Sequence, residues 1–208
     1  MILLNLINQS NDTNNSTIVI FQAPPAGDTA PGDSAGHALY AWKVISNIRP
    51  GETFTFKYPS ENFASACDSW GNFGQMMPAP PGSSFVMQLT SDGEELTHIN
   101  PPLDPGAVVI RNGMKSDAIS AYIYKGGRPL AAKMNMKPGQ EAWFVFPHEI
   151  CVCVMPDVQE GLPFPEPPEA TRIAIDPKIK RADIVMTGGG SGSAVTPFRF
   201  TLQNVVMV

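Results

Sequence analysis

Short apolar runs follow one another along the chain, and they predict strands rather than helices. The segment Thr53–Tyr58 alternates polar and apolar residues with period two, which is typical of a strand that buries one face. No window of a dozen residues has the 3.6-residue apolar period of an amphipathic helix. The predicted strands, rich in Val, Ile, Phe, Tyr and Thr, are Leu3–Ile7, Thr17–Gln22, Ala41–Ile45, Thr53–Tyr58, Phe85–Thr90, Ala107–Ile110, Ser120–Tyr124, Leu130–Met136, Ala142–Phe146, Ile150–Met155, Arg172–Ile175, Asp183–Met186 and Phe198–Val208.

Many short strands with turns between them predict an all-β protein, built as an antiparallel β-sandwich of the jelly-roll or immunoglobulin-like type. Helix is expected only in short turns, such as one turn within Phe63–Trp70. Proline, glycine and small polar residues predict long loops, and the glycine-rich one is typical of a flexible linker or hairpin loop. These loops are residues 23–36, 76–84, 156–168 and 187–197.

A repeated motif indicates an internal duplication. Asn47–Glu52 (NIRPGE) resembles Asn135–Gln140 (NMKPGQ), and in both copies another proline follows nine residues after the first. Each Pro-Gly pair predicts a type II turn, because proline fixes φ at the first corner and glycine takes the positive φ at the second. We therefore predict two duplicated halves, residues 1–100 and 101–208, as tandem sandwich domains or as one sandwich with pseudo-twofold symmetry.

Composition narrows the class of protein. Hydrophobic residues make up 43% of the chain, which is enough for a core and excludes a disordered chain. The 21 prolines exclude a coiled coil or helical bundle. The net charge of −5 argues against a nucleic-acid partner, since phosphate binding requires clustered Lys and Arg.

The sequence gives no sign of a membrane or secretory protein. No run approaches the roughly 18 apolar residues of a membrane-spanning helix. The apolar N-terminal segment has no basic flank and no cleavage site, so no signal peptide is predicted. The odd, small number of cysteines favours a reducing compartment. A cytoplasmic location is therefore expected.

The cysteines and histidines give no metal-binding pattern. Cys151 and Cys153 alternate within a predicted strand and are interpreted as small buried side chains rather than as a redox or metal pair. The three histidines are scattered and lack zinc-ligand or cupin-type spacing. Neither Gly188–Gly192 nor the pair His148-Glu149 has the partners that a catalytic motif needs. We expect no catalytic residue, no metal and no cofactor.

The loop 63–77 carries the candidate ligand-binding residues. Aromatic side chains on a loop offer contact area, and nearby Asp or Asn supply directional hydrogen bonds, as in a site for a sugar or a small ligand. The residues selected on this basis are Trp70, Phe73, Asp68 and Asn72. The competing interpretation is that this loop folds back over an open end of the sandwich and plugs it.

Three functions follow from these features. The first is a non-enzymatic sandwich that acts by self-assembly or by binding another protein. This function is suggested by the terminal segments Met1–Ile7 and Leu202–Val208, which contain no charged residue. Such segments are expected either to lie inside the sheet or to pair with another subunit. The second function is a carbohydrate- or small-ligand-binding module that uses the aromatic loop. The third is a metal-dependent jelly-roll enzyme, for which the sequence offers the least support.

Overall fold

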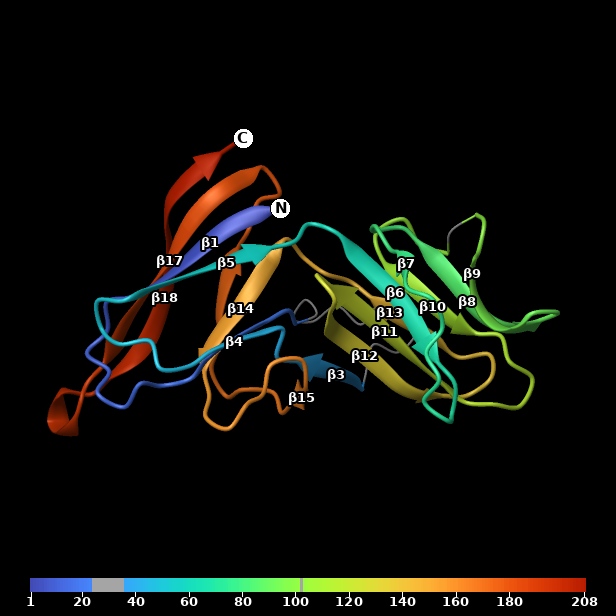
Figure 1. Ribbon diagram of the computed structural model, residues 1–208, viewed down its shortest axis with the longest axis horizontal. Coiled ribbons are helices and arrows are strands. Elements are labelled where there is room, and N and C mark those ends of the chain that lie inside the picture. Colours follow the sequence, from blue (N-terminus) through green and yellow to red (C-terminus); the bar gives the residue numbers. More distant parts are fainter. Residues whose placement is uncertain (24–35, 102) are drawn as a thin grey trace. The chain divides into compact units, whose positions relative to one another are not determined.

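The computed structural model describes residues 1–23, 36–101 and 103–208, which form strands and turns throughout (Figure 1). Strands account for 55% of the structure. Within the described residues, the single helical element is a three-residue 3-10 turn, η1 (Gly192–Ala194). The predicted all-β class is therefore confirmed. Residues 24–35 of the predicted loop 23–36 lie outside the described residues.

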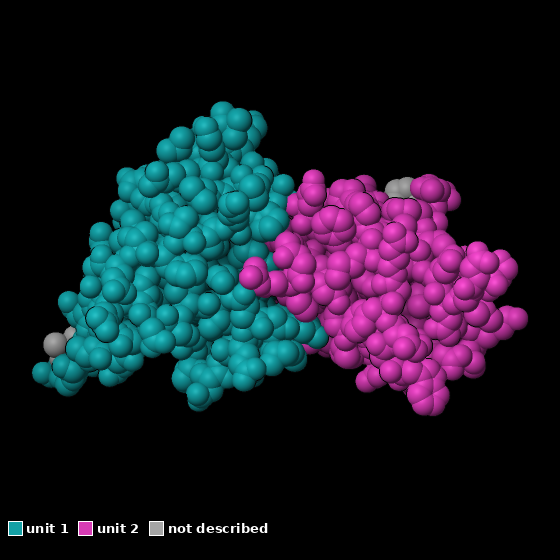
Figure 2. Space-filling view, viewed as in Figure 1, with its two compact units in different colours: residues 1–23, 40–60, 148–208 teal, residues 24–39, 61–147 magenta. Residues whose placement is uncertain are grey.

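The chain forms two compact units, and each is assembled from separate stretches (Figure 2). Unit 1 comprises residues 1–23, 40–60 and 148–208, whereas unit 2 comprises residues 61–147 with the described end of the stretch 24–39. Residue 100, where the sequence placed the boundary between halves, falls inside unit 2. The units thus differ from the consecutive halves 1–100 and 101–208.

Unit 1 contains two four-stranded sheets. The first, sheet A, has the order β18-β17-β1-β5, and the second, sheet B, has the order β16-β14-β2-β4. Strand β1 pairs in parallel with β17, and the other neighbouring strands in these two sheets pair antiparallel. The strands of unit 1 are β1 (Ile2–Asn8), β2 (Ile18–Phe21), β4 (Lys43–Ile45), β5 (Thr53–Tyr58), β14 (Glu149–Val154), β15 (Pro163–Phe164), β16 (Thr171–Ala174), β17 (Ile179–Gly189) and β18 (Thr196–Met207).

Unit 2 also contains two sheets. The order in one is β13-β10-β8-β9, and the other includes the run β3-β12-β11-β6-β7. Strand β10 pairs in parallel with β8. The strands are β3 (His37–Tyr40), β6 (Asn62–Cys67), β7 (Met77–Pro78), β8 (Ser84–Thr90), β9 (Gly93–His98), β10 (Val108–Asn112), β11 (Ile119–Lys125), β12 (Arg128–Met136) and β13 (Glu141–Phe144).

The strand orders of the two units correspond. The order β18-β17-β1-β5 has the same pattern as β9-β8-β10-β13, including a single parallel pair at the second junction. The order β16-β14-β2-β4 likewise has the pattern of β7-β6-β11-β12. In this correspondence β1, β2, β4 and β5 match β10 to β13, whereas β14, β16, β17 and β18 match β6 to β9.

The two Pro-Gly turns occupy equivalent connections. One lies between β4 and β5, and the other lies between the corresponding strands β12 and β13. Gly51 has φ of 89° and Gly139 has φ of 82°, as the second corner of a type II turn requires. The backbone bond that closes each turn measures 3.0 Å and joins Glu52 N to Arg49 O in the first, Gln140 N to Lys137 O in the second.

A buried asparagine anchors each of these turns. Asn8 ends β1 and Asn112 ends β10, and both are completely inaccessible to solvent. Each side chain spans the gap between two backbone segments, because its Nδ2 donates to the carbonyl before the turn and its Oδ1 accepts from the amide two residues ahead. The bonds are Asn8 Nδ2 to Ile48 O (2.9 Å), Ser10 N to Asn8 Oδ1 (3.0 Å), Asn112 Nδ2 to Met136 O (2.8 Å) and Met114 N to Asn112 Oδ1 (2.9 Å).

Aromatic side chains join the two sheets within each unit. In unit 1, Trp42 is 1% exposed and its ring centroid lies 5.3 Å from that of Tyr58 and 6.3 Å from that of Phe56. In unit 2, the ring of Phe144 stacks on that of His37 with a centroid distance of 4.7 Å. Since Trp42 immediately precedes β4 and the two other rings stand on β5, these contacts pack a side chain next to sheet B against side chains of sheet A.

Candidate functional site

Strand β18 forms an open edge of sheet A (Figure 1). It is 12 residues long and pairs antiparallel with β17 on one side. On the other side, no strand of the described residues is hydrogen-bonded to it. Backbone N–H and C=O groups on such an edge are a template for pairing with a further strand.

Apolar side chains are exposed at the C-terminal end of this edge. Val205, Val206 and Met207 are 44%, 50% and 48% exposed. Val206 is in register with Arg181 of β17, which is in register with Leu3 of β1, so these side chains share a face of sheet A. Leu3 is itself exposed. Arg181 thus stands between Val206 and Leu3, so the exposed apolar side chains of the edge itself are those at the end of β18, in which Arg199 is the one charged residue.

A ladder of polar side chains crosses all four strands of sheet A on the same face. Thr55 Oγ1 donates to Asn5 Oδ1 (2.8 Å), and Asn5 Nδ2 donates to Asp183 Oδ1 (2.6 Å). Asn204 of β18 donates to the other carboxylate oxygen, Asp183 Oδ2, at 2.7 Å. Asn204 has a positive φ of 50° and lies where the register of β17 and β18 shifts. The ladder thus holds β18 to β17 at Asn204, the residue directly before the exposed apolar end of β18.

Hydrogen bonds from Asn204 and Asn5 lower the pKa of Asp183 below the ordinary aspartate value. The ionised carboxylate therefore stabilises the fold above the unfolded-state pKa of about 3.9, and this contribution disappears as the pH falls through the lower folded-state pKa.

We expect the loss of stability between about pH 5 and pH 3 to be shallower in Asp183→Asn than in the wild type. Urea-unfolding midpoints measured across this range test the prediction. The control is Asp92→Asn, at an exposed hairpin tip. Equal pH dependence of Asp183→Asn and the wild type would show that the ladder carboxylate has no such role.

The corresponding edge of unit 2 is protected. Strand β9 has six residues, and among them Glu94 and Glu95 are exposed. Short edge strands with charged side chains are a common defence against unwanted pairing. Strand β18 has twice that length and no carboxylate, so the two equivalent edges differ in their capacity to accept a partner strand.

The sequence-predicted ligand residues lie around a tight loop of unit 2. The expected loop 63–77, with a helical turn within Phe63–Trp70, is wrong in part, because Asn62–Cys67 form β6, which pairs with β11 and β7. The loop itself is closed by Asp68, whose Oδ1 accepts from the backbone N–H of Trp70 (2.9 Å) and of Asn72 (2.8 Å). Asp68 and Asn72 therefore hold each other, with Asn72 Nδ2 donating to Asp68 Oδ2 at 2.8 Å.

The two aromatic candidates differ in how far they project. Trp70, at the tip, is 88% exposed. Phe73 is partly exposed and its ring centroid lies 5.1 Å from that of Tyr122. The hydrogen bonds from Asn72 also lower the pKa of Asp68, which keeps this carboxylate ionised and bound within its own loop. The loop thus exposes the ring of Trp70, while the side chains of Asp68 and Asn72 form hydrogen bonds within the loop itself.

The cysteines are free thiols and are buried. Burial raises the pKa of Cys153 to about 11, so this thiol is neutral at pH 7. Across the described ranges, no group of three or more His, Cys, Asp or Glu side chains is arranged to hold a metal ion. In the same part of the chain, no helix has the length and apolar character needed to cross a membrane.

Sequence reasoning did not identify the Asn5–Asp183 ladder. The available signal was one polar residue inside each of two apolar strands, in the runs Leu3–Ile7 and Ala182–Met186.

Comparisons with protein-family models, curated proteins and solved structures gave no match for this chain.

Proposed function

We propose that this protein is a non-enzymatic β-sandwich protein that acts by self-assembly, with β18 of one copy pairing with β18 of another. The open edge of β18, bordered by exposed apolar side chains, carries the proposal. Strand addition supplies main-chain hydrogen bonds along the edge, and side chains beside it supply apolar contact. A pair of identical edges is compatible with twofold symmetry, the commonest symmetry of homo-oligomers.

We also propose that each unit is a sandwich of its two sheets. The two units then derive from one duplicated eight-strand pattern. The corresponding strand orders and the matched Pro-Gly turns support this. Along the chain, the first four strands of the pattern go to unit 1 and the next four to unit 2, after which the pattern repeats with the units exchanged. This exchange explains how a tandem repeat yields discontinuous units.

We expect the double variant Val205→Lys, Met207→Lys to weaken self-association by at least about tenfold, because two charges would be placed at the pairing edge. Sedimentation velocity over a range of protein concentrations measures this. The matched control is Glu94→Gln, Glu95→Gln on β9, since both double variants change the net charge from −5 to −3. A wild-type protein that remains monomeric throughout, or an equal effect of both variants, would contradict the proposal.

A second candidate function is the binding of a carbohydrate or small ligand by the loop that carries Trp70. The observation in its favour is the 88% exposure of this ring on a loop fixed by Asp68. A glycan screen of the wild type against Trp70→Ala tests it. Glycans bound by the wild type and lost in the variant support this function, and absence of any such glycan rejects it.

A further inference from the structure

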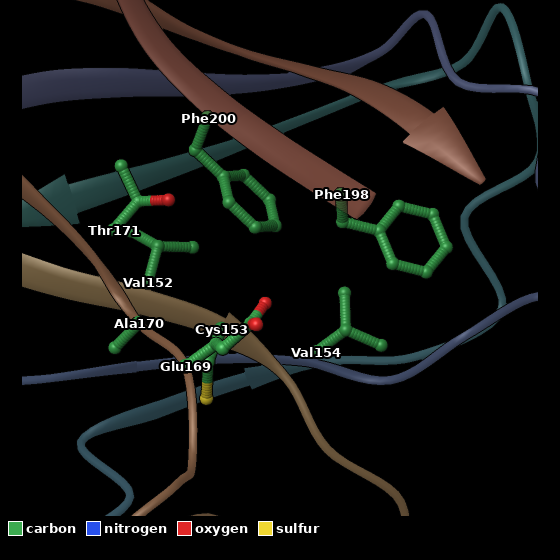
Figure 3. A pocket seen from close by; sticks show the side chains of 8 residues that line it. All are labelled: Val152, Cys153, Val154, Glu169, Ala170, Thr171, Phe198 and Phe200. Atoms are coloured by element: carbon green, nitrogen blue, oxygen red, sulfur yellow. The ribbon is translucent and has the colours of Figure 1, made fainter. Parts of the chain in front are cut away.

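A pocket of about 220 Å³ lies within unit 1, between strands of sheet A and sheet B (Figure 3). Phe198 and Phe200 extend into it from β18, and Val152 and Val154 line it from β14. All of its lining residues belong to the stretch 148–208, so the pocket is a property of this unit alone.

The size and walls of the pocket suit a single aromatic ring. An enclosed cavity of about 150 Å³ accommodates benzene, and this pocket, which is open to solvent on one side, has room for one ring with a short substituent. Two phenylalanine rings on one side and two valine side chains on the other offer apolar and aromatic contact. Thr171 contributes a hydroxyl group to the lining.

One carboxylate gives the pocket its charge preference. Glu169 belongs to the lining, and in Figure 3 its carboxylate is directed toward the two phenylalanine rings. None of the described residues forms a hydrogen bond or an ion pair with it. Cys153, also in the lining, carries a neutral thiol at pH 7 because burial raises its pKa to about 11. Glu169 is therefore the source of negative charge here, and aromatic faces also favour a nearby cation.

We propose that this pocket binds a small primary amine joined to an aromatic ring by a short alkyl chain. The ring packs between the valine and phenylalanine side chains, and the ammonium group pairs with Glu169. This site is separate from the proposed self-assembly, since its ligand contacts side chains, whereas edge pairing uses the free backbone groups of β18.

Titration of the ¹⁵N-labelled protein with 2-phenylethylamine, followed by NMR at pH 7, tests the proposal. We expect saturable shifts of the amides of Thr171, Phe198 and Phe200. The neutral probe 2-phenylethanol, which has the same ring and chain length, is expected to bind about threefold to tenfold more weakly. Absence of saturable shifts at these amides, or equal affinity for the two probes, would overturn the proposal.

Two variants assign the roles of the lining residues. Glu169→Gln is expected to reduce affinity for 2-phenylethylamine to that for 2-phenylethanol while leaving the alcohol unaffected. Phe198→Ala, at a half-buried position, is expected to weaken both probes. The spectrum of each free variant verifies that it is folded. If Glu169→Gln keeps the preference for the amine, the assigned ion pair is wrong.

Discussion

Replacing Trp42 with alanine is expected to lower the free energy of unfolding by about 3–5 kcal/mol, whereas Trp70→Ala is expected to change it by less than about 0.5 kcal/mol. The two tryptophans have opposite environments. Trp42 is 1% exposed and packs against Phe56 and Tyr58 of β5, whereas Trp70 is 88% exposed at a loop tip. Truncation of Trp42 leaves a cavity at the contact between sheets A and B.

Urea unfolding followed by circular dichroism measures both tryptophan variants without relying on tryptophan fluorescence. Trp42→Phe is a useful intermediate, since it keeps an aromatic ring and is expected to fall between the wild type and Trp42→Ala. Similar unfolding midpoints for Trp42→Ala and Trp70→Ala would mean that Trp42 does not join the two sheets as described.

The second large effect is expected at the buried turn asparagines. Asn8→Ala and Asn112→Ala each remove hydrogen bonds to buried backbone groups, and an unsatisfied group costs about 1–3 kcal/mol. We expect each variant to lose about 2–4 kcal/mol of unfolding free energy. The matched control is Asn11→Ala, an exposed asparagine three residues from Asn8, with an expected change below about 0.5 kcal/mol.

These two variants also test the equivalence of the units. If Asn8 and Asn112 hold corresponding turns, their losses of stability are similar, and each variant destabilises its own unit. Hydrogen exchange of the backbone amides in the turn between β4 and β5, and in the turn between β12 and β13, shows which unit each variant destabilises. A small loss of unfolding free energy in one variant and a large loss in the other would show that the corresponding hydrogen bonds do not contribute equally to stability.

The strands that the sequence predicts correctly are those with β-branched or aromatic side chains on a buried face. Thr53–Tyr58 coincides with β5, and Phe85–Thr90 lies within β8. The local sequence pattern is enough to predict such segments as strands, because alternation of polar and apolar residues indicates a half-buried strand. The two Pro-Gly turns were predictable for the same reason, since proline and glycine specify the turn by themselves.

Two of the strands that the sequence missed, β6 and β9, lack this local signal. β6 has the sequence NFASAC, whose small residues fit between neighbouring strands β11 and β7 but carry little strand propensity. β9 has the sequence GEELTH, which is polar because its edge position leaves glutamates in solvent. Tertiary pairing, which the sequence does not display, makes both segments strands.

The same limit applies to the candidate site. Met1–Ile7 and Leu202–Val208 are both free of charged residues, and the sequence did not distinguish their roles. In the structure, β1 lies inside sheet A between β17 and β5, whereas β18 lies at its edge. The position of each strand depends on pairings such as that of Asn5 with Asp183, 178 residues apart. Of these two terminal segments, β18 is therefore the one that lies at an edge of sheet A.

The most direct test of self-assembly through β18 is hydrogen exchange of its backbone amides, residues 196–207, at low and high protein concentration. Pairing of two edges would protect the outward-facing amides, so protection is predicted to rise with concentration in the wild type and to stay constant in Val205→Lys, Met207→Lys. Exchange of these amides that is independent of concentration in the wild type would contradict the account.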